Sequence, residues 1–86
     1  MPKERFEVGE REKHFFTVDG NVITKRIKIE QDGLVVVNEF CIVALGKIYE
    51  FDVGISEKHH VEITFGLFRL IGLKVDGQIV HSIALD

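Results

Sequence analysis

The sequence contains little of what stabilises or anchors many small proteins. Its one cysteine, Cys41, can form no disulfide within the chain and lies among apolar neighbours in "EFCIVAL". No hydrophobic run approaches the length of about 18 residues typical of a transmembrane helix, and no targeting segment is recognisable. These absences predict a cytoplasmic protein with no membrane partner.

Concentrated positive charge is also lacking. The chain has 14 acidic and 11 basic side chains, and the longest basic run is Lys25-Arg26. Because binding to a phosphate backbone needs a concentrated positive surface, we expect no nucleic-acid partner. The single proline and the hydrophobic content of 45% argue against a disordered linker. We therefore expect one domain over residues 1–86.

Helical signals are weak, whereas period-two patterns recur. Alanine occurs only twice, and no segment sustains helical spacing of its apolar residues. Alternation predicts strands in which one face is buried. The expected buried sets are Ile23, Ile27 and Ile29; Tyr49, Phe51 and Val53; and Val61, Ile63 and Phe65. We predict an all-β fold, a small antiparallel β-sandwich of about seven strands, with a small closed β-barrel as the alternative.

Asp-Gly pairs between β-forming residues predict tight hairpin turns, because such turns need positive φ angles. They occur at Asp19-Gly20, Asp32-Gly33 and Asp76-Gly77, and a fourth turn is predicted at Gly46-Lys47.

Two stretches, Leu34 to Val37 and Phe40 to Leu45, are apolar at successive positions. A strand that is apolar on both faces is typical of a central or interfacial strand rather than an edge. Asn38-Glu39 interrupts the two stretches, which predicts a β-bulge there.

The segment "EKHHVEITFG", residues 57–66, contains the side chains most suited to chemistry. We expect Lys58-His59-His60 to belong to a connection that enters the strand Val61 to Phe65. If the strand already begins at His59, adjacent side chains project to opposite faces, so His59 joins Val61 while His60 joins Glu62, and the two histidines cannot chelate one ion together. If the pair lies in the loop instead, both rings can turn toward one ion, but Glu57 and Glu62 must also converge on it. We predict no catalytic, cofactor-binding or metal-binding residue; the alternative is a small metal-dependent or hydrolytic enzyme that uses the His60/Glu62 strand face.

From residue 26 to residue 80, the order of features resembles a domain of the Fas apoptotic inhibitory molecule family. The matching pieces are "RIKIEQDG", "VVNEFCIVALGK", "YEFDVG", "VEITF" and "LIGLKVDGQIV", and the region covers 55 of the 86 residues. Phe40 stands where the family more usually has tryptophan. The resemblance implies a non-enzymatic β-sandwich that acts through protein contacts, in protection against stress or aggregation, with no cofactor.

Both lines of reasoning favour a protein-interaction module. A small sheet protein also leaves free edges, which recruit further strands, so we expect a homodimer that forms through an edge strand. The terminal segment "GQIVHSIALD" has no lysine and so lacks the usual charged protection of an edge.

Overall fold

The computed structural model describes residues 3–21, 23–40, 47–66 and 69–84. These residues form nine strands. No helix occurs in the described ranges, and so none there is long and apolar enough to cross a membrane.

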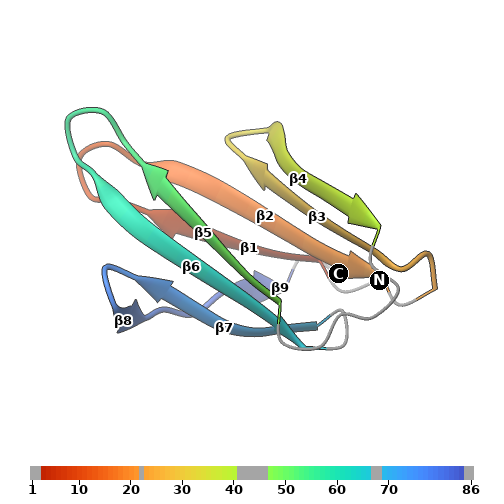
Figure 1. The fold of residues 1–86 in the computed structure, drawn as a ribbon. Helices are drawn as coiled ribbons and strands as arrows, with labels where there is room; N and C mark the ends of the chain where they lie inside the picture. Colours follow the sequence, from red (N-terminus) through yellow and green to blue (C-terminus); the bar gives the residue numbers. More distant parts are fainter. Residues whose placement is uncertain (1–2, 22, 41–46, 67–68, 85–86) are drawn as a thin grey trace.

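The strands form two antiparallel sheets that lie in two layers (Figure 1). The N-terminal sheet has the order β4-β3-β2-β1-β9, and the C-terminal sheet has the order β5-β6-β7-β8. The first contains β1 (Lys3–Val8), β2 (His14–Asn21), β3 (Arg26–Gln31), β4 (Leu34–Phe40) and β9 (Ile83–Ala84). The second contains β5 (Lys47–Val53), β6 (His59–Gly66), β7 (Arg69–Val75) and β8 (Gln78–Ile79). The predicted all-β sandwich is confirmed, and the described sheets do not close into a barrel.

The core lies between the two sheets and is built by alternation, as predicted. Ile27 and Ile29 of β3 are fully buried, and so are Val61 and Ile63 of β6 in the other sheet. Phe6 and Phe16 stack with ring centroids 5.1 Å apart. Truncation of such side chains to alanine typically costs about 2–5 kcal/mol. The remaining buried members are Val8, Val18, Val53, Phe65 and Leu73.

Two of the predicted Asp-Gly turns are confirmed. Asp32 and Asp76 have φ angles of 51° and 53°, and the glycine after each is also at positive φ, as a tight hairpin turn needs. The pair Asp19-Gly20 instead lies inside β2, so the third predicted turn is wrong.

The β2–β3 turn comes a few residues later. The Asn21 side chain accepts hydrogen bonds from the backbone N–H groups of Ile23 and Thr24, as asparagine commonly does in turns. Ile23 is therefore 84% exposed, which corrects its predicted place beside Ile27. The turn predicted at Gly46-Lys47 falls partly outside the described residues, and Lys47 begins β5.

Residues 34–37 do not take the predicted central position. They belong to β4, which among the described strands pairs with β3 alone and forms an edge of the N-terminal sheet. An interfacial position of this strand stays a prediction. The bulge is also misplaced by the prediction: Ile29 faces Val37 and Glu30 faces Val35, so Val36 has no residue opposite it on β3. Of the second apolar stretch, residues 41–45 lie outside the described residues.

The terminal segment crosses between the sheets. Val75 and Lys74 of β7 pair with β8, whereas Ile83 lies opposite Arg5 of β1. The segment therefore supplies an edge strand to each sheet, but each of these strands has only two residues.

Candidate functional site

His60, the residue on which the enzyme alternative depends, lies on the exposed face of β6. Its Nδ1 atom is 2.9 Å from Asp52 Oδ1 and its Nε2 atom is 3.0 Å from Glu50 Oε1. Asp52, and then Glu50, raises the pKa of His60 above its ordinary value. Glu62 lies two residues along the same strand face, opposite Lys74 of β7 in the sheet register. The ring nitrogens of His60 therefore bond to side chains of β5 rather than to Glu62.

The His60 cluster is an open surface feature. The side chains of His60, Glu50 and Asp52 are 45%, 59% and 90% exposed. Within the described ranges, no group of three or more histidine, cysteine, aspartate or glutamate residues is placed to hold a metal ion. A protonated histidine between two carboxylates forms ion pairs with both. The geometry therefore favours a structural role for His60, as a link between β5 and β6, over a catalytic one.

His59 has different partners, because β6 begins at this residue and successive side chains alternate between faces. Its Nδ1 and Nε2 atoms each lie 2.5 Å from a carboxylate oxygen, of Asp76 and Glu57 respectively. The strand therefore begins two residues before the strand expected over residues 61–65, so the prediction that the two histidines lie in the connection is wrong. Because both lie in β6, they point to opposite faces, as the sequence predicts for a strand that begins at His59.

The described residues reveal a second cluster that matches the one around His59. The two ring nitrogens of His14 lie 2.6 Å from carboxylate oxygens of Asp32 and Glu12. The aspartate in each cluster also accepts a hydrogen bond from the backbone N–H of the residue that follows the histidine. This residue is Phe15 for Asp32 and His60 for Asp76. Each His-Asp pair therefore fixes the start of one strand against one hairpin turn.

The glutamates of the two clusters cross between the sheets. Glu57 accepts hydrogen bonds of 2.8 Å from the backbone N–H groups of Glu10 and Arg11. Glu12 accepts bonds of 2.7 and 2.8 Å from the N–H groups of Ile55 and Ser56. We call residues 9–13 and 54–58, which Figure 1 shows side by side at one end of the sandwich, the paired loops.

Backbone shape makes the paired loops possible. Gly9 and Gly54 have φ angles of 100° and 102°, and a Cβ atom on either would lie about 2 Å from a backbone oxygen of its own loop, at 2.1 Å from Glu12 O and 1.9 Å from Glu57 O. Any other residue there is excluded both by φ and by space.

The charges of these clusters reinforce one another. Asp32 and Glu12 raise the pKa of His14, and Asp76 and Glu57 raise that of His59. Conversely, His59 and the Glu10 and Arg11 N–H groups lower the pKa of Glu57 to about 2. Both nitrogens of each ring face carboxylate oxygens, which suits a protonated imidazolium that donates twice.

The sequence carries a signal for these residues. The segment "FEVGEREKH" at 6–14 repeats as "FDVGISEKH" at 51–59, with six of nine positions identical. A second correspondence joins Asp32-Gly33 to Asp76-Gly77. Internal repeats of this kind predict that two structural units share one plan. Here β1 to β4 form one unit and β5 to β8 the other, while β9 from the end of the second unit pairs with β1 of the first. Sequence reasoning from turns and periodicity missed them.

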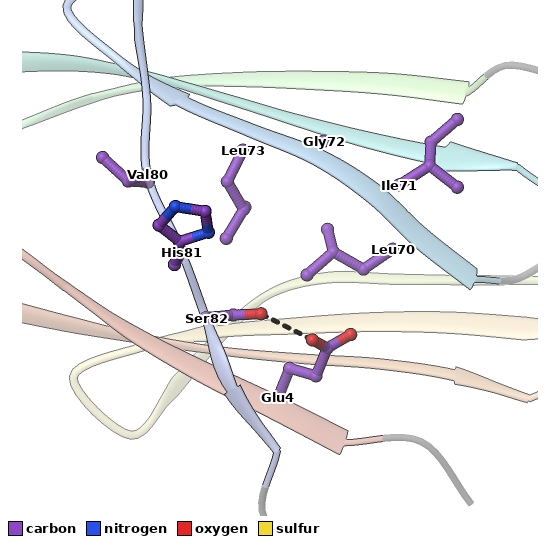
Figure 2. Close-up of a pocket in the computed structure, with 8 residues that line it drawn as sticks. All are labelled: Glu4, Leu70, Ile71, Gly72, Leu73, Val80, His81 and Ser82. Atoms are coloured by element: carbon purple, nitrogen blue, oxygen red, sulfur yellow. Dashed lines mark hydrogen bonds between the residues drawn. The ribbon is translucent and has the colours of Figure 1, made fainter.

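The two sides of the sandwich close differently. On one side, the Ser82 hydroxyl donates to Glu4 Oε1 over 2.5 Å, as Figure 2 shows. On the other side, the Tyr49 hydroxyl donates to Glu39 Oε2 over 2.5 Å. The hydroxyl proton of Ser82 is therefore engaged in a hydrogen bond to β1. The cavity of about 190 Å³ beside it is lined by Glu4, Leu70, Ile71, Gly72, Leu73, Val80, His81 and Ser82.

The edge strand β4 is the most apolar exposed feature among the described residues. Leu34 is 73% exposed and Phe40 is 59% exposed, while Val35 and Val36 are 50% and 43% exposed. Glu39 is the only charged residue of the strand, and it is engaged by Tyr49 and by Lys47, whose Nζ atom lies 3.6 Å away. An apolar edge of this length is a ready template for pairing with another strand.

Comparison of the chain with models of protein families, with curated proteins and with solved structures gives no match.

Proposed function

We propose that the chain is a non-enzymatic protein-interaction module whose binding surface is the free edge of β4. The observation that carries this proposal is a seven-residue edge strand, Leu34–Phe40, that keeps large apolar side chains in water. Burial of such side chains stabilises a complex by about 25 cal/mol per Å² of apolar surface removed from water. A free edge adds backbone hydrogen bonds to this term.

The proposed mode of binding is the addition of an extended strand from the partner protein. Backbone hydrogen bonds along β4 supply affinity, and the side chains around Val35 and Phe40 select which residues of the partner fit. The charged clusters of the paired loops support this role indirectly, because they hold the two sheets together at the end of the sandwich and so keep β4 on a rigid scaffold.

We extend the proposal to protection against stress or aggregation, which the resemblance to the Fas apoptotic inhibitory molecule family implies. A strand paired with β4 is withheld from pairing with other exposed strands, and unpaired strands are what aggregates recruit. We also propose the cytoplasm as the compartment, in line with the single cysteine.

The enzyme alternative has one observation in its favour, the convergence of Asp52 and Glu50 on His60. Against it, the three side chains lie on an open sheet face, where water screens charges and no substrate is enclosed. We therefore prefer the interaction module.

A photo-cross-linking residue at Asn38 tests the proposal. Asn38 is exposed near the middle of β4, and a matched control position, Gln78, is exposed on the two-residue edge strand β8. In the cell of origin, we expect Asn38 to form covalent adducts with a protein chain and Gln78 to form far fewer. If Asn38 forms no more adducts than Gln78, the β4 edge is not the binding surface.

A further inference from the structure

The fourth strands of the two repeats, β4 and β8, follow equivalent Asp-Gly turns but differ in length and pairing. After Asp76-Gly77, the segment "QIVHSIA" leaves its sheet after Ile79 and crosses to β1 as β9. After Asp32-Gly33, the segment "LVVVNEF" stays beside β3 for all seven residues. One repeat thus shortens its free edge, and the other keeps a long one.

The residue types follow this difference. The crossing segment contains Gln78, His81 and Ser82, whereas the corresponding part of β4 is Leu34, Val37 and Asn38. Apolar residues occur in both segments, but only β4 has an unbroken run of four, Leu34 to Val37, along its edge. Exposed apolar edges are normally protected by charge, proline, a bulge or a short length. Of these, β4 has the bulge at Val36 and one charged residue near its end, Glu39.

We infer that β4 pairs antiparallel with β4 of a second copy of this chain, which joins two N-terminal sheets into one continuous sheet. The inference rests on the proposed function, because it names a partner for the same edge. It is carried by a matched comparison inside the chain and by the charge pattern of the strand.

The position of the one charge on β4 is compatible with this arrangement. Glu39 lies next to the C-terminal end of β4, so antiparallel pairing sends the two Glu39 side chains to opposite ends of the contact. The middle of the contact is formed by Val35, Val36 and Val37 from each copy, with no like charges opposed. A two-fold contact of this kind needs only one surface patch, which serves both copies.

The other free edges fit a second copy less well. β5 carries Glu50 at its centre and Asp52 nearby, so antiparallel self-pairing brings like charges together. The strands β8 and β9 have two residues each, which allows few backbone hydrogen bonds. Among the strands that the structure describes, β4 therefore offers the best self-complementary edge.

Sedimentation of the purified chain across a range of concentrations tests the inference. We expect a species of twice the monomer mass of 9.8 kDa. Val35→Lys should shift it to the monomer, because a lysine on an edge strand opposes pairing. Ile79→Lys is the matched control, because Ile79 lies two residues after Gly77, as Val35 does after Gly33, and is 75% exposed. The Ile79→Lys variant should remain a dimer. A wild-type monomer at every concentration overturns the inference.

A second measurement does not depend on whether Val35→Lys folds. In the purified protein, a photo-cross-linking residue at Asn38 should join two copies, with the insertion mapped to residues 34–40 of the second copy. Insertion elsewhere, or no adduct, contradicts the β4 pairing. If the purified chain is monomeric and Asn38 still captures another protein in cells, this inference fails while the proposed function stands; if neither occurs, both fail.

Discussion

Glu12 and Glu57 exchange hydrogen bonds between the two sheets: each carboxylate accepts backbone N–H groups from the loop that carries the other. A histidine holds each glutamate in position: His14 contacts Glu12, and His59 contacts Glu57. Because the relationship is reciprocal, the loss of either carboxylate frees one of the paired loops while the other stays bound.

The first prediction concerns this exchange. Glu57→Gln should lower the midpoint of urea unfolding, because the neutral amide is a weaker acceptor for the Glu10 and Arg11 N–H groups than the carboxylate is. Glu12→Gln should act alike, and the double variant should lose less than the sum of the two single losses, since both act on one contact. Glu62→Gln is the control on the exposed face of β6. Equal midpoints for Glu57→Gln and Glu62→Gln would refute the structural role.

Stability should also depend on pH in a defined direction. The pKa values of His14 and His59 are raised in the folded state, so their contribution is complete below the ordinary histidine pKa of about 6.5 and is lost as pH rises through the folded values. The lowered pKa values of Asp32, Asp76 and Glu57 act oppositely, and their contribution is lost at strongly acidic pH. The free energy of unfolding should therefore be greatest at mildly acidic pH.

Chemical denaturation over a pH series checks this expectation. The double variant His14→Gln, His59→Gln should reduce the decline of stability above neutral pH; His60, whose pKa is also raised, accounts for a remaining part. A wild-type stability that rises steadily from mildly acidic to alkaline pH contradicts the assignment.

Gly54 should tolerate no side chain. Gly54→Ala places a Cβ atom 1.9 Å from the Glu57 carbonyl oxygen at a φ of 102°. Gly77→Ala is the matched control, since Gly77 also has positive φ, at 81°, but has no atom within 4 Å of the added Cβ. We expect Gly77→Ala to cost about 1–2 kcal/mol and Gly54→Ala to cost clearly more, as measured by urea unfolding. Equal costs mean that crowding is unimportant there.

The His60 cluster should bind zinc weakly. Tight zinc sites hold three or four ligands in fixed geometry, whereas Asp52 and Glu50 are already hydrogen-bonded to the one histidine between them. Calorimetric titration should give no stoichiometric binding tighter than micromolar. Tight binding that is lost in both His60→Ala and Asp52→Ala would promote the enzyme alternative.

Local patterns predicted the interior well. The alternation along β3 and β6 placed Ile29 and Ile63 in the core, because a strand with one wet face fixes the side of every residue. Local turn chemistry was less decisive. Asp19-Gly20 resembles a turn, but Gly20 is buried opposite Ile27 in the β2–β3 pair, and the Asn21 side chain organises the turn instead.

The errors at β4 and at the paired loops have a different origin. The apolar residues around Val36 are compatible with a central strand or with an apolar edge strand, and the strand order of the sheet, which no local pattern predicts, separates these possibilities. The bonds between Glu12 and Glu57 join residues 45 positions apart, which no local pattern can predict. The repeat of "VG" and "EKH" at the same spacing is the sequence feature that could have indicated them.

The central claim, that β4 is an edge that receives a strand, is tested most directly by amide hydrogen exchange. The N–H groups of residues 34–40 should exchange more slowly when the protein is concentrated or when extract from its own cell is added, while those of Gln78 and Ile79 should not change. Exchange at residues 34–40 that is the same under all three conditions would contradict the account.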